Sequence, residues 1–292
     1  RVGTNNWLGY QPFFKAQQNG FWDTRNIAVV ELGSATEVIR ALSNKSIDAA
    51  ALTLDEAITA RTRNSDLQVV MITDFSYGGD ALIAKPGLAS LADLKGKTIA
   101  LENTALGAIM LDAVLTSAGL SEADVRIKPL TFDQHINALE NDDIDAVITF
   151  DPVRTRLLAQ GYRDLFNSRA IPGTIVDVLV VSASIADRYP EQLRQIVAGF
   201  FKARRLIVGG DGPVIDAVSR RLHISSDAVI AGYQQLKMPD LQENKVLIAQ
   251  CETGLRQTAD RLLDIMQERR IINQNVSLDN LCNNRLIHEI TL

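Results

Sequence analysis

Short apolar runs alternate with longer segments of helical spacing over the first two thirds of the chain. Runs of four to eight apolar or β-branched residues predict buried strands, and apolar residues every three or four positions predict amphipathic helices. A strand is expected before Asn5, and others at 27–32, 48–54, 67–75, 98–101, 125–130, 146–150 and 177–181. Regular alternation of the two patterns predicts an α/β fold.

The pattern changes after Pro190, where helical spacing dominates and no further strand is evident. One stripe joins Leu193, Ile196, Val197 and Phe200, which places them on a single helix face. We expect this C-terminal third to form a helical cover on the first lobe.

Two matching segments divide the remainder of the chain. Ala41-Leu42 followed by Ile47-Asp48-Ala49 recurs 97 positions later as Ala138-Leu139 followed by Ile144-Asp145-Ala146. In each copy a helix ends and a strand begins, which predicts two lobes of similar βα construction. The alternative is chance agreement among common residues.

The expected lobes are discontinuous in sequence. Lobe I comprises residues 1–79 and 182–292, and lobe II comprises residues 80–181. Gly78-Gly79-Asp80 and the strand around 178–181 are the expected crossings, because lobe borders need backbone freedom without a long disordered tether.

Charge and composition exclude two classes of partner. The 292 residues carry 30 Lys and Arg against 35 Asp and Glu, a net charge of −5, so no broad positive field is available for nucleic acid. Apolar runs such as 49–54 are far shorter than the roughly 20 residues of a membrane helix.

The chain begins at Arg1 without a secretory signal, so we expect a processed start.

Enzyme and metal signatures are weak. The dinucleotide, P-loop and nucleophile-elbow glycine motifs do not occur, and the three histidines are isolated from one another. We therefore expect no catalytic residue, no cofactor and no metal. Cys251 and Cys282 either form one disulfide in an oxidising compartment or are two buried thiols.

Candidate binding residues cluster at strand-to-helix turns, where ligands bind in open α/β sheets. Ser34 and Glu37 form a capping-box pattern, and Asn103 or Thr104 caps the corresponding turn of the second lobe. Each turn is either a plain helix cap or a ligand contact. Asp55 and Asp177 favour a ligand with hydrogen-bond donors or positive charge.

An ordered set of segments resembles the periplasmic substrate-binding proteins of ABC importers. These are Asn6-Trp7-Leu8-Gly9-Tyr10-Gln11-Pro12-Phe13, Gly33-Ser34 with Glu37, Ile47-Asp48-Ala49-Ala50, Ser90-Leu91-Ala92-Asp93-Leu94-Lys95-Gly96-Lys97 and Phe150-Asp151-Pro152. More narrowly, the chain is similar to the nitrate, sulfonate and taurine group, which also includes thiamine-pyrimidine binders.

The resemblance implies a type II periplasmic-binding fold, with two α/β lobes, each a mixed sheet flanked by helices, that close on a small molecule. It implies a monomer that delivers its ligand to a membrane permease and is periplasmic or lipid-anchored outside the cytoplasm. The implied pocket positions are Asn6, Trp7, Tyr10, Ser34, Ala35, Thr36, Thr53, Asp55, Tyr77, Asn103, Thr104, Ala105, Phe150 and Asp177.

The turns depart from the expected pattern for an anion site. They carry Asp55, Glu102, Asp151 and Asp177 without an evident Arg or Lys, which favours an amine-bearing or heterocyclic ligand over nitrate or a sulfonate. Two other classes stay open: a ligand-sensing domain of a membrane receptor, and an enzyme of the thiamine-pyrimidine type on the same fold.

Overall fold

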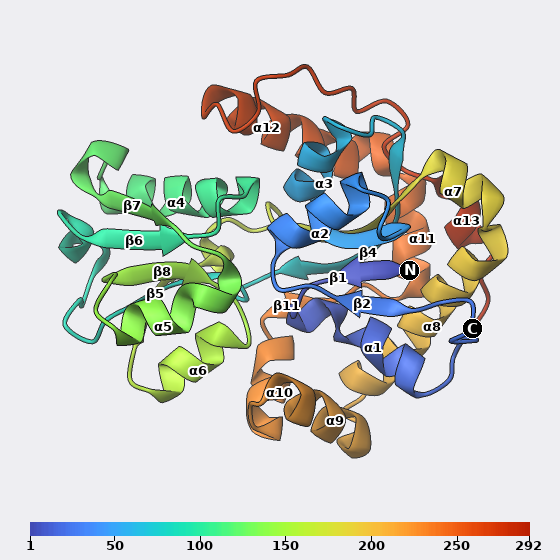
Figure 1. Cartoon of the computed structure of the whole chain (residues 1–292), viewed down its shortest axis with the longest axis horizontal. Helices are drawn as coiled ribbons and strands as arrows, with labels where there is room; N and C mark the ends of the chain where they lie inside the picture. The colour runs from blue at the N-terminus through green and yellow to red at the C-terminus, as the bar shows by residue number, and fades with distance from the viewer.

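A computed structural model describes all residues, 1–292, and contains two separate mixed β-sheets flanked by helices (Figure 1). The first sheet has the order β11-β4-β10-β3-β1-β2. Its strands are β1 Val2–Thr4, β2 Val29–Glu31, β3 Ala49–Thr53, β4 Leu67–Ser76, β10 Val176–Ser182 and β11 Leu236–Lys237. We call the part of the molecule built on it lobe I.

The second sheet has the order β7-β6-β8-β5-β9 and forms the core of lobe II. Its strands are β5 Ala81–Ala84, β6 Thr98–Leu101, β7 Arg126–Pro129, β8 Ala146–Thr149 and β9 Arg163–Asn167. The expected two-lobe α/β architecture is confirmed.

Helices cover the faces of both sheets (Figure 1). Lobe II carries α4 Ala105–Ala118, α5 His135–Glu140 and α6 Val153–Ala159. Lobe I carries α1 Gln11–Gln18, α2 Ala35–Ser43, α3 Leu54–Arg61, α7 Ala183–Arg188, α8 Pro190–Val208, α9 Gly212–Leu222, α10 Ser226–Tyr233, α11 Leu241–Ala249, α12 Leu255–Glu268 and α13 Asn284–His288. No helix has both the length and the apolar character that crossing a membrane requires.

The internal repeat corresponds to a real structural repeat. In lobe I, β1 pairs in parallel with β2 and β3, and β3 pairs antiparallel with β10. In lobe II, β6 pairs in parallel with β7 and β8, and β8 pairs antiparallel with β5. The two matching segments lead into β3 and β8, which occupy equivalent places in the two sheets.

The expected second crossing needs correction. The chain leaves the first sheet after Ser76 and enters the second at Ala81, so the first crossing lies where Gly78-Gly79-Asp80 predicts it. The return comes between Asn167 and Val176, because β10 pairs with both β3 and β4 of the first sheet. A uniformly apolar strand does not reveal which sheet it joins. We therefore propose that lobe II ends before Val176.

Most expected strands are present within one or two residues, but β5, β9 and β11 are not evident from the sequence. β5 is four buried residues, Ala81–Ala84, directly beside a turn, and β9 is a polar, half-buried edge strand. β11 has only two residues. Such strands exist because a neighbouring strand supplies the hydrogen bonds, which local periodicity does not record.

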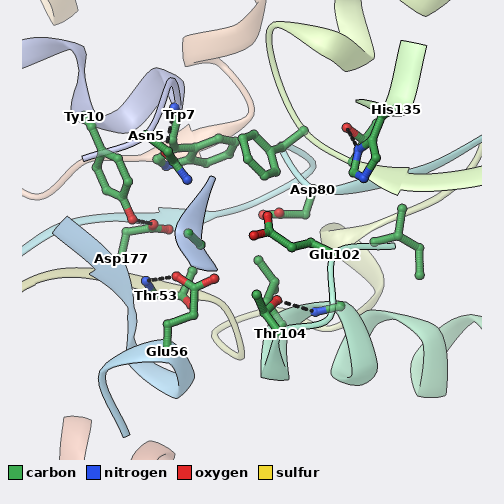
Figure 2. Close-up of a pocket in the computed structure, with 16 residues that line it drawn as sticks. Asn5, Trp7, Tyr10, Thr53, Glu56, Asp80, Glu102, Thr104, His135 and Asp177 are labelled. Atoms are coloured by element: carbon green, nitrogen blue, oxygen red, sulfur yellow. Dashed lines mark hydrogen bonds between the residues drawn. The ribbon is translucent and has the colours of Figure 1, made fainter. Parts of the chain in front are cut away.

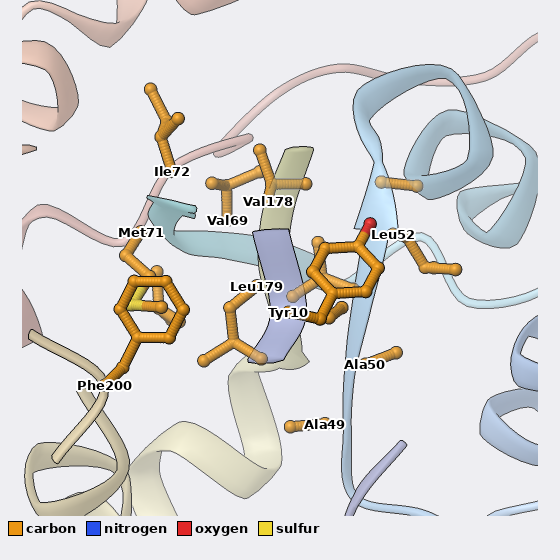
Figure 3. Close-up of a cluster of buried hydrophobic side chains, with 14 of the residues drawn as sticks. Tyr10, Ala49, Ala50, Leu52, Val69, Met71, Ile72, Val178, Leu179 and Phe200 are labelled. Atoms are coloured by element: carbon orange, nitrogen blue, oxygen red, sulfur yellow. The ribbon is translucent and has the colours of Figure 1, made fainter. Parts of the chain in front are cut away.

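The main core lies in lobe I and joins both faces of the first sheet to the C-terminal helices. Leu52, Met71, Val178 and Leu179 from three adjacent strands pack with Phe200 of α8 in one buried cluster (Figure 3). The C-terminal helices therefore cover lobe I, as predicted. Lobe II has two smaller clusters of its own, one on each face of its sheet.

The two cysteines form a disulfide. Cys251 and Cys282 have Cα atoms 6.3 Å apart, within the usual range for a disulfide. Cys282 also forms an isolated backbone β-bridge with Val69 of β4. The disulfide therefore ties the C-terminal segment to lobe I.

Candidate ligand-binding site

A cavity lies between the two lobes, where the ends of strands from both sheets meet (Figure 2). The volume open to the centre of a water molecule is about 40 Å³. By the same measure, one ordered water needs roughly 10–15 Å³. Its lining residues are Asn5, Trp7, Tyr10, Ala35, Thr53, Glu56, Asp80, Glu102, Thr104, Leu106, Gly107, His135, Ile148, Thr149, Phe150 and Asp177.

Strand register brings acidic residues to equivalent points of the two lobes. Asp177, at the start of β10, lies opposite Thr53 on β3. In lobe II, Ala81 on β5 lies opposite Thr149 on β8. Since β5 and β8 are antiparallel, Asp80, which precedes Ala81, comes beside Phe150, which follows Thr149. Phe150 lies 97 residues after Thr53, so it is the corresponding position in the second copy of the repeat. Each lobe therefore places one carboxyl group at the same point of its sheet.

Three helices begin at the cavity wall with their first turns capped. The Ser34 hydroxyl accepts from the Glu37 amide at the start of α2, at 3.3 Å, and Glu56 Oε2 accepts from the Thr53 amide at the start of α3, at 3.0 Å. Thr104 Oγ1 accepts from the Gly107 amide at the start of α4, at 3.3 Å. The expected caps at Ser34 and Thr104 are present.

Four carboxyl groups, and no lysine or arginine, line the cavity: those of Glu56, Asp80, Glu102 and Asp177. Figure 2 shows them arranged around the same space. Burial raises the pKa of Asp80 to about 7. Burial, followed by repulsion from Asp74, holds the pKa of Asp177 well above its usual range, and burial followed by repulsion from Asp55 does the same to the pKa of Glu56.

Two further acids lie directly behind this wall. Burial raises the pKa of Asp74 to about 7 and that of Asp55 to about 6, although hydrogen bonds to both groups oppose the rise. The carboxyl groups share a low-dielectric space without a compensating cation, so their charged forms are costly. A positively charged ligand would relieve that cost.

Aromatic rings form one wall of the cavity and cross from lobe I to lobe II. The indole of Trp7 meets the ring of Phe150 edge to face with centroids 5.4 Å apart. Phe150 in turn stacks on Phe132 at 4.2 Å. Trp7 Nε1 donates to the Asp74 carboxylate at 3.2 Å, which fixes the indole plane.

His135 is held in its neutral form. Burial lowers its pKa to about 4. Its Nε2 lies 3.3 Å from the Leu130 carbonyl oxygen and its Nδ1 lies 3.1 Å from Thr149 Oγ1. Because a carbonyl oxygen can only accept, Nε2 carries the proton and Nδ1 accepts from the Thr149 hydroxyl. His135 therefore adds no positive charge to the cavity.

Some buried polar atoms around the cavity have no partner within the protein. The hydroxyl of Tyr10 donates to Asp177 Oδ1, but Asp177 Oδ2 is unpartnered, as is Asp55 Oδ2 behind the wall. Unpaired buried polar atoms are costly. A ligand that donates a hydrogen bond would satisfy Asp177 Oδ2, which lines the cavity.

Half of the expected pocket positions line the cavity. They are Trp7, Tyr10, Ala35, Thr53, Thr104, Phe150 and Asp177. The residues come from both lobes, as the expectation of a site between two halves requires.

The other expected positions lie elsewhere. Thr36, Asn103 and Ala105 line an open groove beside the cavity. Ser34 is a buried cap, Asp55 lies behind the wall, and Asn6 is half-buried next to the lining residue Asn5. Tyr77 is 37% exposed, with Arg169 and Lys237 over its ring.

Several lining residues are not among the expected positions: Asn5, Glu56, Asp80, Glu102, Leu106, Gly107, His135, Ile148 and Thr149. Glu56 and Glu102 lie in strand-to-helix turns that the sequence identifies, so their place at the cavity could be predicted. Asp80 lies in the Gly78-Gly79-Asp80 crossing that the sequence marks, but only the pairing of β5 with β8 places it at the cavity. His135 carries no such signal.

Comparison with solved structures supports the fold assignment. The alkanesulfonate-binding protein SsuA from Xanthomonas axonopodis pv. citri, solved with MOPS, is 18% identical and superposes with a TM-score of 0.75, covering 99% of this chain and 96% of its own. The ligand-binding component of an ABC-type import system from Staphylococcus aureus, solved with zinc bound, is 12% identical with a TM-score of 0.80, covering 99% and 98%.

An enzyme shares the same architecture. The desulfurization enzyme DSZB is 16% identical with a TM-score of 0.71, covering 98% of this chain and 97% of its own. At these identities the likeness establishes the fold alone. No curated protein sequence matches the chain.

The expected resemblance is confirmed at the level of the family. The family model described as NMT1-like matches residues 1–212, well over half of the sequence. This match spans all of the strands that build the cavity and both copies of the internal repeat. The chain therefore belongs to the NMT1-like family.

Proposed function

We propose that this protein is a non-catalytic, extracytoplasmic solute-binding protein that captures a small molecule between its lobes and delivers it to the membrane permease of an ABC importer. The ligand carries a protonated amine or an amino-substituted heterocycle such as a pyrimidine. The observation that carries the ligand class is the cavity wall, which has four carboxyl groups and no lysine or arginine.

The geometry supports this class in two ways. Unpartnered Asp177 Oδ2 offers an acceptor to an N–H donor. Trp7 and Phe150 supply aromatic faces and edges, which attract both cations and planar rings. Nitrate or a sulfonate would instead bring a further negative charge to the carboxyl groups.

The small size of the cavity supports a mechanism of capture by closure. The free space fits only a few atoms, yet residues of both lobes enclose it, so the lobes must separate before a ring-sized ligand can enter. A ligand that contacts both lobes shifts the equilibrium toward the closed form by its difference in affinity for the two forms.

The disulfide supports an extracytoplasmic location. Disulfides persist in oxidising compartments and are rare in the cytosol, and both cysteines of the chain are joined in one. A sensing domain of a membrane receptor would use the same cavity. The two roles differ in whether the ligand-bound form stimulates transport by a permease in reconstituted vesicles.

Thermal-shift and calorimetric titrations test the proposal. We expect primary amines and aminopyrimidines to raise the melting temperature, and nitrate, methanesulfonate and taurine to leave it unchanged. Turnover of any bound compound, followed by mass spectrometry, would contradict a non-catalytic role. Binding of nitrate or a sulfonate by the unaltered protein would overturn the ligand class.

A further inference from the structure

Glu102 connects the two lobes across the cavity. It follows β6 of lobe II and precedes Thr104, the cap of α4, and its side chain reaches α2 of lobe I. Its Oε1 atom accepts from the Thr36 amide at 3.0 Å and from the Thr36 hydroxyl at 2.7 Å. Only 9% of the residue is exposed.

The position that Glu102 occupies is one where oxyanions bind to proteins. The first turn of a helix presents free amide groups and a partial positive charge. In α2, Ser34 already accepts from the Glu37 amide, and Glu37 accepts from the Gly33 amide at 2.8 Å. The Thr36 amide is the donor that faces lobe II, and the protein's own carboxylate takes it.

A second observation shows that this space is built for a ligand. Asp177 is only 2% exposed, lines the same cavity, and leaves Oδ2 without a partner. The cavity thus holds an unused acceptor, while Glu102, which lines it, takes the two donors of Thr36 in the groove beside it.

We propose that Glu102 is a specificity-determining residue, an internal anion that occupies the oxyanion position at the start of α2. By filling it, Glu102 excludes small oxyanions and keeps the cavity for a ligand that donates hydrogen bonds. The inference rests on the proposed function, since it explains how this chain selects such a ligand.

Removing the carboxylate should weaken the selection against oxyanions. Glu102→Ala frees both donors of Thr36, removes one negative charge from the wall and vacates the space of the carboxylate. The variant should therefore gain affinity for nitrate, sulfate or methanesulfonate and lose affinity for amines.

The test is isothermal titration of the full chain with these three anions and with an aminopyrimidine. For Glu102→Ala, we expect roughly tenfold or greater tightening for at least one anion relative to the unaltered protein. Glu37→Ala is the matched control, because it removes the same charge from the same helix while Glu102 stays in place, and it should gain no anion binding.

The outcomes separate the two proposals. If the unaltered protein binds amines but Glu102→Ala gains no anion affinity, the role of Glu102 is overturned and the proposed function stands. If the unaltered protein itself binds nitrate or a sulfonate, the ligand class is wrong. Circular dichroism checks the fold of the variant, and Glu102→Ser, which retains a small polar side chain, replaces it if Glu102→Ala does not fold; the same gain is expected.

Discussion

Trp7 and Phe150 meet edge to face across the boundary between the lobes, with ring centroids 5.4 Å apart and planes at 89°. Trp7 follows β1 of lobe I and Phe150 follows β8 of lobe II, so each ring sits at the end of a strand. The pair is one of the places where apolar surfaces of the two lobes meet. Because both rings line the cavity, the shape of this wall depends on the relative position of the two sheets.

Phe150→Ala should favour the open form. The substitution removes an aromatic pair worth about 0.5–1.5 kcal/mol beyond its buried area, and it also removes a wall of the site. We expect weaker ligand binding and a larger radius of gyration by small-angle scattering. Tyr189→Ala, at an exposed position far from the cavity lining, is the control and should change neither quantity.

Asp177→Asn tests the charge of the wall while it keeps the shape of the side chain. Because a hydrogen bond to a charged group contributes about 1.5–3 kcal/mol, binding of a protonated amine should weaken by roughly that amount. The ligand-free protein should become more stable, since Asn carries no charge for burial, and then repulsion from Asp74, to disfavour. Calorimetry and thermal melts measure the two effects, with exposed Asp187→Asn as the control.

The fold could be predicted from the sequence further than the site. The 97-residue repeat marks β3 and β8 directly, because a helix end followed by Ile-Asp-Ala is a local signal. The place of β10 in the first sheet is a pairing between distant strands and leaves no such signal.

The same distinction applies to the cavity. Thr53 ends a strand that periodicity identifies, and Trp7, Thr104 and Phe150 follow such strands, so their place at the cavity could be predicted. Asp80 and His135 reach it through the register of β5 with β8 and through a hydrogen bond to Thr149. Both depend on tertiary contacts. The acidic character of the site could be predicted, because the turns that carry it could be located.

The ligand-free protein should lose stability as the pH rises from about 4 to about 7. Asp74 and Asp80 have pKa values of about 7 against an ordinary 3.8, so in this range the folded state holds protons that the unfolded chain has released. Stability therefore falls with rising pH. His135, with a pKa of about 4 against 6.5, opposes this trend as a single group.

Thermal melts at pH 5 and pH 8 check this direction. We expect the melting temperature to be lower at pH 8 by about 5 °C. Asp74→Asn and Asp80→Asn, made together, should reduce this difference, and Glu56 and Asp177, whose pKa values are also raised by burial, should account for what remains. A melting temperature that rises from pH 5 to pH 8 would show that these carboxyl groups are not the dominant titrating groups.

Binding of a permanently charged ammonium ligand should show the complementary dependence on pH. Such a ligand favours the ionised carboxylates, so its binding releases protons from Asp80 and its neighbours when the pH is below about 7. Its affinity should increase from pH 5 to pH 8. Titrations in buffers with different enthalpies of ionisation measure the number of protons released, and a value of zero at pH 6 would contradict the expected coupling.

Loss of the disulfide should lower stability without changing the site. Cys251 and Cys282 are 31 residues apart in sequence, and neither lines the cavity. A cross-link of this span stabilises a protein by about 2–4 kcal/mol, mainly by restricting the unfolded chain. The double change Cys251→Ser and Cys282→Ser should reduce the free energy of unfolding in urea by that amount. Ligand affinity should stay the same, and reductant added to the unaltered protein should reproduce the effect; a parallel loss of affinity would show that the C-terminal segment of lobe I is coupled to the cavity.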